Sequence, residues 1–209
     1  MEYRSQVEKP QIELVEQQDG EVTLCINSSQ AMQGWEQDMM RESAELLCGY
    51  GSEFLEVGLG LGFSALHIAN HPNTRRHVVV EKYREVIDLF HQRHPDPPVN
   101  LEIVEADFFY YVLELKEESL DGIFFDPALP MELWDHQPLW EAIMPLIVTA
   151  LRRGGVFIPF FSTEPILRKQ YVPFFDKVVV YRQPFQAYLT TEYTYGTSGD
   201  AYIQCFVKS

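Results

Sequence analysis

The chain has 209 residues, 46% of them hydrophobic, and its 16 Lys and Arg stand against 31 Asp and Glu, a formal net charge of −15. This length can bury a sizeable core, and no Pro/Gly/Ser-rich linker divides the chain, so we expect one globular unit. The acidic excess disfavours a surface that binds a phosphate backbone, which argues against nucleic acid as a partner or substrate.

The first fifty residues are predicted to form an N-terminal extension or lid. Apolar residues alternate with more polar ones from Val22 to Ile26, which indicates a short strand. The segment from Ala31 to Met40 then leads into a helix that runs to about Leu47. Such an extension could simply cover a sheet edge, or it could close over a ligand and expel water from a reaction.

From Phe54 onward, apolar strands alternate with helical segments. The predicted strands are Phe54–Val57, His77–Val80, Leu101–Val104, Gly122–Phe125 and Val156–Phe161. The predicted helices are Ser64–Asn70, Arg84–Arg93, Phe108–Leu115 and Leu139–Leu151. Two later β-rich runs, Lys177–Tyr181 and Tyr202–Val207, are typical of antiparallel strands at the C-terminal end of such a fold. Residues 51–209 are therefore predicted to form an α/β domain: a Rossmann-like, doubly wound, mostly parallel seven-stranded sheet with an antiparallel C-terminal strand.

The most informative segment is the turn after the first of these strands, where glycine occupies every second position. Gly58 and Gly60 let the backbone turn sharply and pass close to a ligand, a path that a Cβ atom would block. Gly62 is expected where the next helix packs on the strand. The pattern E-x-G-x-G-x-G, which starts at Glu56, is the form seen in S-adenosylmethionine (SAM) methyltransferases rather than the G-x-G-x-x-G dinucleotide fingerprint.

Acidic residues after the next two strands extend this predicted SAM site. Glu81 ends the second strand, where it can accept hydrogen bonds from ribose hydroxyls. Asp107 follows the third strand and is placed to meet the adenine, with Phe108 beside it; it also suits the N-cap of the following helix. An isolated glycine turn is a weak signal, but the turn, the acid and the strand context together predict SAM as the cofactor.

Two further acids are candidates for the chemistry itself. Asp126 ends the fourth strand, at the edge where ligands bind in such sheets, although Asp126-Pro127 could form only a rigid turn. Glu36 lies beside Trp35, and a carboxylate next to a large aromatic ring suits a flat cation.

The segment Met32-Gln33-Gly34-Trp35-Glu36, followed by Met40, resembles the N-terminal segment of guanidinoacetate N-methyltransferase, which has a near-identical Met-x-x-Trp-Glu with a methionine four residues on. The resemblance covers roughly Met32 to Thr163. It continues through Leu55–Gly58, Glu81, Asp121–Asp126, His136-Gln137 and Leu151–Val156.

This resemblance implies a class I SAM-dependent methyltransferase that acts on a nitrogen of a small guanidino or amino compound. In that family the residues matching Glu36 and Asp126 hold the guanidinium, and the aspartate helps to remove a proton. Met32 and Met40 match methionines that contact the cofactor. The chemistry itself favours such a pair, because two carboxylates can orient a planar guanidinium and localise its charge.

Two departures from the family concern the substrate pocket, which is predicted to include Trp35. Ala128 stands where the family has an aromatic residue. In the family's Asn-Leu-Thr stretch, whose backbone binds the guanidinoacetate carboxylate, only Thr163 is retained. These changes imply a pocket of different shape, suited to a longer guanidino compound such as arginine or to a different amine.

Three alternatives remain open. The first is methyl transfer to an oxygen, carboxylate or carbon acceptor in specialised metabolism. The second is aminopropyl transfer from decarboxylated SAM, and the third is a non-catalytic SAM-binding protein.

Other features of the sequence concern metal sites, disulfides, location in the cell and partners. Cys25, Cys48 and Cys205 lie far apart with no C-x-x-C pair, so neither a metal site nor a disulfide framework is predicted. We find no secretory signal and no apolar run of membrane-spanning length, so a cytoplasmic enzyme without a membrane partner is expected. Its predicted partner is a small-molecule methyl acceptor, and the apolar N-terminal strand leaves room for a homodimer.

Overall fold

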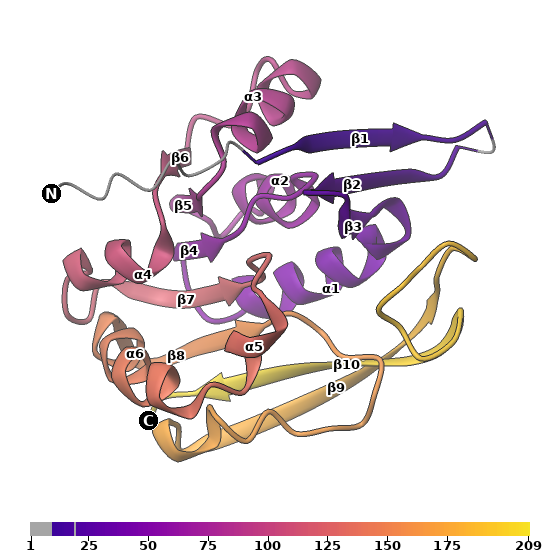
Figure 1. Ribbon diagram of the computed structural model, residues 1–209. Helices are drawn as coiled ribbons and strands as arrows, with labels where there is room; N and C mark the ends of the chain where they lie inside the picture. Colours follow the sequence, from indigo (N-terminus) through magenta and orange to yellow (C-terminus); the bar gives the residue numbers. More distant parts are fainter. Residues whose placement is uncertain (1–9, 19) are drawn as a thin grey trace, which may run out of the picture.

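The computed structural model describes residues 10–18 and 20–209, and its centre is a seven-stranded sheet in the order β6-β5-β4-β7-β8-β10-β9 (Figure 1). Its strands are β4 (Glu53–Val57), β5 (Arg76–Glu81), β6 (Leu101–Glu105), β7 (Leu120–Phe125), β8 (Leu151–Pro159), β9 (Lys177–Gln186) and β10 (Ser198–Val207). Strands β4 to β8 pair in parallel, whereas β10 is antiparallel to both of its neighbours. The predicted Rossmann-like sheet with an antiparallel C-terminal strand is confirmed.

Helices cover both faces of this sheet because successive side chains along each central strand point to opposite sides. On β4, Phe54 packs into the core cluster that includes Leu47 of α1, whereas Leu55 packs into the cluster that includes Trp140 of α6. The helices on the first face are α1 (Gln37–Cys48), α2 (Phe63–Asn70) and α3 (Arg84–Arg93). Those on the second are α4 (Phe108–Tyr111) and α6 (Gln137–Ala150). Short turns of helix complete the chain: η1 (Gly34–Glu36), η2 (Val112–Glu114), α5 (Met131–Trp134) and η3 (Val172–Phe174).

Several element boundaries differ from the prediction. The helix predicted from Phe108 to Leu115 is divided into α4 and the 3-10 turn η2. Strand β8 begins at Leu151 and ends at Pro159, so Phe161 has already left the sheet. The two C-terminal strands are each ten residues long, because they pair along their whole length from Lys177↔Val207 to Gln186↔Ser198.

The N-terminal segment forms a separate three-stranded antiparallel sheet of β1 (Ile12–Glu16), β2 (Val22–Ile26) and β3 (Ser29–Gln33). The strand predicted at Val22–Ile26 is present, but β1 and β3 were not predicted. Strands β2 and β3 are joined by a two-residue turn in which Asn27 and Ser28 both have positive φ, 52° and 63°, as tight hairpins require. Asn-Ser is a weak sequence signal for such a turn. Residues 1–9 and Asp19 of the predicted 1–50 extension lie outside the described residues.

Within the described part of the chain, no helix is long and apolar enough to cross a lipid bilayer.

Candidate active site

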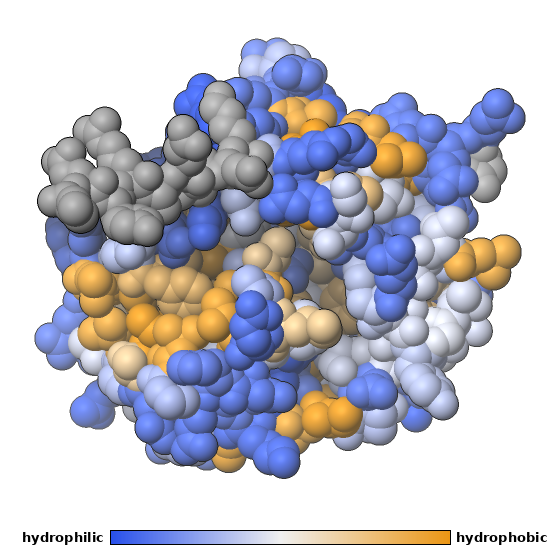
Figure 2. Space-filling model, in the orientation of Figure 1, coloured by the Kyte–Doolittle hydropathy of each residue, from blue (hydrophilic) through white to orange (hydrophobic). Residues whose placement is uncertain are grey.

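A cavity of about 270 Å³ lies where the carboxyl ends of β4, β5 and β7 meet the N-terminal sheet. Figure 2 shows a hollow near the middle of the molecular face, with apolar residues gathered on its α4 side. Its floor includes Gly58 and Gly60, and its roof includes Leu24, Ile26 and Met32 of β2 and β3. A parallel sheet binds ligands at this edge, so the cavity lies where the sequence predicts the cofactor.

The glycine turn follows its path because two of its residues have no side chain. Gly58 has φ +90°, and a Cβ atom there would collide with the backbone carbonyl oxygen of Asp126. Gly60 has φ +50°, and its missing Cβ leaves room for the thioether of Met32. That sulfur accepts a hydrogen bond from the backbone N–H of Leu61 at 3.3 Å, which connects β3 to the turn. Met32 therefore lines the cavity, and its contact with a cofactor stays a prediction.

Glu81 lines the cavity from the end of β5, and the backbone holds its carboxylate in place. One oxygen accepts from Leu59 N–H and the other from Tyr83 N–H, each at 2.9 Å. The side chain is only 7% exposed, and burial raises its pKa, while the backbone hydrogen bonds oppose that rise. A fixed carboxylate at this edge suits the recognition of vicinal hydroxyls.

Asp107 also lines the cavity and is the N-cap of α4, accepting from Phe109 N–H at 3.0 Å. Its second oxygen lies 3.0 Å from Nζ of Lys82, another cavity residue, and this contact raises the pKa of Lys82. Phe108 lies next to it, buried against the cavity wall. Asp107, Lys82 and Phe108 thus place an acid, a cation and an aromatic ring on the α4 side of the cavity.

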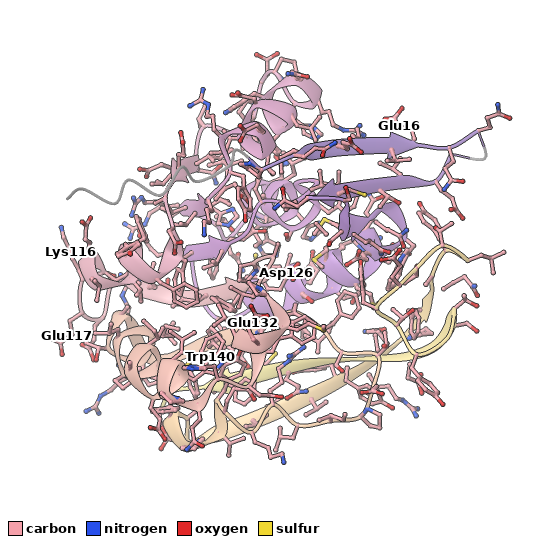
Figure 3. All side chains as sticks on the ribbon, in the orientation of Figure 1. Glu16, Lys116, Glu117, Asp126, Glu132 and Trp140 are labelled. Carbon is pink, nitrogen blue, oxygen red and sulfur yellow. The ribbon has the colours of Figure 1, made fainter. Side chains whose placement is uncertain are left out.

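A second group of side chains, which we call the acid pair, consists of Glu36 and Asp126. Asp126 directly follows β7 near the centre of the molecule (Figure 3), and Glu36 ends η1 just before α1. The negative charge of Glu36 contributes to the raised pKa of Asp126, so the two carboxyl groups interact across the space between β7 and η1. Asp126 and Ala128 line the cavity as well, so the acid pair adjoins the predicted cofactor site.

Burial makes the acid pair hold protons at unusually high pH. It raises the pKa of Glu36 to about 7, against the hydrogen bonds from Tyr193 and Gln33 that favour the charged form. Burial, and then the charges of Glu36 and Glu56, raise the pKa of Asp126 well above its ordinary value. Two enclosed carboxyl groups with raised pKa values are suited to bind a cation and to accept a proton.

Tyr193 completes this arrangement from the loop between β9 and β10, residues 187–197. Its hydroxyl donates to Oε1 of Glu36, which also accepts from Gln33 N–H at 2.6 Å. Burial and the neighbouring charges of Glu36 and Asp126 raise the pKa of Tyr193, so it stays protonated as a donor. We call residues 187–197 the C-terminal loop; Figure 1 shows it reaching toward the β3–α1 junction.

The buried side chain of Gln33 fastens the C-terminal loop to β3. Its amide nitrogen donates to Thr190 Oγ1 at 3.2 Å, and its amide oxygen accepts from Thr191 Oγ1 at 2.6 Å. The same oxygen accepts from the indole N–H of Trp35 at 3.0 Å. The Trp35 ring packs between Phe161 and Phe185, with centroid distances of 5.9 and 5.5 Å. The ring of Trp35 is therefore held in place next to Glu36 in the chain.

Arg168 places a cation near the acid pair. Its Nη2 donates to the carbonyl oxygens of Phe160 and Phe161 at 3.0 and 3.3 Å, just beyond the end of β8. Its guanidinium lies 3.7 Å from the centroid of the Phe160 ring. The charge of Arg168 opposes the rise in the pKa of Asp126, so the field of this cation reaches the acid pair.

Some predicted site residues lie away from the cavity. Glu56 is 1% exposed beneath the sheet edge, where it accepts from Ser64 Oγ and lies 3.0 Å from Nε2 of His77. Gly62 caps α2 and packs against Phe90. Met40, on α1, is fully buried in the core. Thr163, in the loop after β8, is partly buried and is not among the residues that line the cavity.

Sequence reasoning did not place Arg168 or Gln33 in named roles at this site, and it did not predict the contact of Tyr193 with Glu36. Gln33 lies inside the Met-x-x-Trp-Glu segment, whose spacing suggested function but not this contact. Tyr193 belongs to a tyrosine-rich C-terminal region, and aromatic residues in such regions usually only pack. Arg168 has no surrounding motif, so no local signal could have identified it.

Comparisons with known proteins bear on the family and the fold of the chain. Residues 10–176 match the family profile of guanidinoacetate N-methyltransferase. A search of curated proteins finds no match. The structure resembles spermidine synthase from Thermotoga maritima, with a TM-score of 0.71, 18% identity, and coverage of 97% of this chain and 70% of that one. A spermidine synthase in complex with the transition state analogue AdoDATO matches with a TM-score of 0.69 and 15% identity, over 95% of this chain and 71% of that one. A protein described as an O-methyltransferase from Klebsiella pneumoniae matches with a TM-score of 0.56 and 12% identity, over 82% of this chain and 80% of that one.

The structural matches, all at low identity, show a shared fold, whereas the family match extends over most of the chain and includes the acid pair. The chain thus belongs to the guanidinoacetate N-methyltransferase family and is a class I SAM-dependent methyltransferase.

Proposed function

We propose that the protein methylates a nitrogen of a small guanidino or amino compound, using Glu36 and Asp126 to bind and deprotonate the acceptor. The observation that carries this proposal is the acid pair itself: two enclosed carboxyl groups, with pKa values raised by burial, next to the cavity. An acceptor without positive charge gives no physical reason to keep two acids in this position. A guanidinium could form charge-assisted hydrogen bonds with both carboxylates.

The cavity residues fit SAM. Glu81 would accept from the ribose hydroxyls, Asp107 would accept from the adenine amino group, and Gly58 and Gly60 leave the space for close approach. Leu24, Ile26 and Met32 would cover the ligand and exclude water, which gives the N-terminal sheet the role of a lid. When bound there, SAM supplies an electrophilic methyl group.

The acid pair would serve the acceptor in two ways. Glu36, held by Gln33 N–H and Tyr193, would orient the guanidinium through charge-assisted hydrogen bonds. Asp126 would accept the proton that the reacting nitrogen loses as it gains the methyl group, because a carboxyl group with a raised pKa is a competent base. Much of the rate enhancement would come from orienting the two reactants in this enclosed space.

The test is the production of S-adenosylhomocysteine from SAM across a panel of arginine, guanidinoacetate, agmatine, simple amines, phenols and carboxylic acids. We expect turnover with guanidines or amines only, and a loss of at least about a hundredfold in kcat/KM for Glu36→Gln and Asp126→Asn. Asp38→Asn is the matched control, since its side chain on α1 is 70% exposed and pairs with Arg41. Turnover of an uncharged acceptor that survives Glu36→Gln would contradict the proposal.

Aminopropyl transfer is the second candidate, because the resemblance to spermidine synthase covers 97% of this chain and so includes the N-terminal sheet. Competition between SAM and decarboxylated SAM separates the two activities. Preferential binding of SAM supports methyl transfer, whereas preferential use of decarboxylated SAM with an amine acceptor would support the alternative.

A further inference from the structure

Strand β9 forms one edge of the central sheet and is ten residues long (Figure 1). It pairs with β10 without a register shift, and within residues 10–18 and 20–209 no strand lies on its other side. A free edge presents backbone N–H and C=O groups that can pair with another strand, so native proteins usually keep edge strands short or interrupt them with bulges. Strand β9 is neither short nor bulged.

The hydrogen bonds of β10 show which residues of β9 turn their backbone groups to the open edge. The backbone of Tyr202 on β10 donates to Ser162 O at 2.7 Å and accepts from Ser162 N–H at 3.1 Å. Its register partner on β9 is Arg182, whose N–H and C=O therefore point away from β10. Because these directions alternate along an antiparallel pair of strands, Val178 and Val180 also point outward.

This outward edge is apolar and exposed at its centre. Val180 is 51% exposed and Tyr181 is 37% exposed, although both lie within a strand of the central sheet. The next outward residue after Arg182 is Pro184, which has no N–H, so the continuous row of outward donors ends at Arg182. The part of the edge that can pair fully thus begins at Val178 and ends at Arg182, with Val180 at its middle.

We propose that β9 is a dimer interface, at which two copies of the chain pair their edges antiparallel about a two-fold axis at Val180. In this register Val180 faces Val180 of the second copy, and Val178 faces Arg182. Every outward N–H and C=O group between Val178 and Arg182 then has a partner, so the edge is complementary to itself. The pairing would also cover the exposed Val180 and Tyr181. This inference goes beyond the proposed function and does not depend on it.

The charges along β9 fit this register. Lys177 would face the uncharged side chain of Gln183 on the second copy. Arg182 lies 3.5 Å from the carboxylate of Asp200 in its own chain, which compensates its charge. Placing the axis at Arg182 instead would set two guanidinium groups directly opposite each other, which destabilises a strand pair.

Pro184 favours the same register. An axis at Tyr181 would place Pro184 opposite Val178 of the second copy, whose carbonyl oxygen would then lack a donor. With the axis at Val180, Pro184 lies beyond the residues that exchange hydrogen bonds.

Protection of a free edge is the competing explanation, because charged residues and proline on an edge strand also oppose association. The net charge of −15 acts in the same direction, through repulsion between two copies. Salt screens this repulsion, so the proposed dimer should strengthen as the salt concentration rises. A protected edge would leave the protein monomeric at every salt concentration.

The experiment is sedimentation equilibrium of the full chain, from micromolar to hundreds of micromolar protein, at low and high salt. We expect a monomer–dimer equilibrium for the wild type and association at least about tenfold weaker for Val180→Lys, because like charges would then face each other. Mixing Val180→Lys with Val180→Glu should restore the dimer, since the facing charges become opposite. Val99→Lys is the matched control, because Val99 is fully exposed and lies outside β9.

Cysteine variants test the register itself. Val180→Cys should form a disulfide between two copies under mild oxidation, because facing residues of a hydrogen-bonded pair have Cα atoms about 5.5 Å apart. Tyr181→Cys should not, because position 181 faces Val179 of the second copy. The native cysteines are common to both variants, so a difference between the variants comes from the new thiol.

A wild type that stays monomeric throughout this range, or a dimer that survives Val180→Lys, would overturn the proposal. Cross-linking through position 181 in place of position 180 would overturn the register. Circular dichroism and the melting temperature show whether each variant is folded. If Val180→Lys does not fold, the two cysteine variants decide the question.

Discussion

The hydroxyl of Tyr193 donates a hydrogen bond to Oε1 of Glu36, across 157 residues of sequence. Glu36 comes from the turn that precedes α1, and Tyr193 from the loop between the two C-terminal strands. The surroundings of Glu36 are thus assembled from both ends of the described chain, whereas most residues that line the cavity come from the segments between them.

Replacing Tyr193 with Phe is expected to shift the pH dependence of activity. The hydroxyl favours the charged form of Glu36, so its removal raises the pKa of that carboxyl above about 7. The acid limb of kcat/KM for a guanidino acceptor should move up by about one pH unit, which corresponds to a hydrogen bond of about 1.4 kcal/mol. Tyr195→Phe, at a position that is 85% exposed, should leave the profile unchanged. An unshifted limb in Tyr193→Phe would show that the contact does not tune Glu36.

Glu36 also makes the stability of the ligand-free protein depend on pH. Its pKa rises from the reference value of 4.5 to about 7 in the folded state, so the folded protein binds a proton that the unfolded chain has lost. The corresponding stabilisation is complete below pH 4.5 and is lost as pH rises through 7. Between about pH 4.5 and 8 the wild type should lose about 3 kcal/mol of unfolding free energy relative to Glu36→Gln.

Urea unfolding of both proteins across this pH range measures the difference. In the Glu36→Gln variant, the new amide oxygen can still accept from Tyr193 and Gln33, so the substitution removes the charge with little change in shape. Parallel pH profiles for the two proteins would contradict the raised pKa of Glu36.

Glu81→Gln is expected to weaken cofactor binding without unfolding the protein. The variant loses the negative charge that would face the ribose. Its amide oxygen can still accept from Leu59 N–H, whereas its amide nitrogen faces Tyr83 N–H, so one backbone hydrogen bond is lost. We expect affinity for S-adenosylhomocysteine, measured by calorimetry, to fall about tenfold to a hundredfold. Glu105→Gln, an exposed position at the end of β6, provides the control. Equal affinities in Glu81→Gln and the wild type would place the ribose elsewhere.

Two alanine substitutions in the glycine turn should differ in severity. A Cβ at position 58 meets backbone atoms of Asp126 and the Cα atom of Pro127 at 3.0 Å, which cannot move independently of β7. A Cβ at position 60 meets the flexible end of Met32, at 2.7 Å from Cε, which can rotate away. Gly58→Ala should therefore lower the melting temperature and cofactor affinity more than Gly60→Ala. The reverse order would show that Met32 is held more rigidly than its side chain suggests.

The sheet and its helices could be predicted because their sequence signals are local. Apolar runs bounded by Gly, Pro and Asp identify β4 to β8, and the limits of α3 at Arg84 and Arg93 agree with the prediction. The N-terminal sheet was only partly predicted, since β1 and β3 depend on pairing with β2. In such cases tertiary contacts outweigh local preference.

For the site, the sequence was informative about Glu36, Asp126 and the glycine turn, which lie in recognisable motifs at strand or helix ends. It was uninformative about Arg168 and the contact made by Tyr193. Their positions depend on how β10 pairs with β8 and β9 and on the contact of Gln204 with the loop after β8. Such long-range relationships leave no periodic pattern in the chain.

The position of β10 between β8 and β9 has a consequence for the order of folding during synthesis. Strand β9 leaves the ribosome before β10, yet its described sheet neighbour is β10, so it cannot join the sheet until the later strand arrives. The parallel strands β4 to β8, and the sheet edge that borders the cavity, need no residue beyond Pro159 for their own pairing. A nascent chain can therefore form its parallel half early, while Tyr193 and Gln204 make their contacts only when the last described strand is in place.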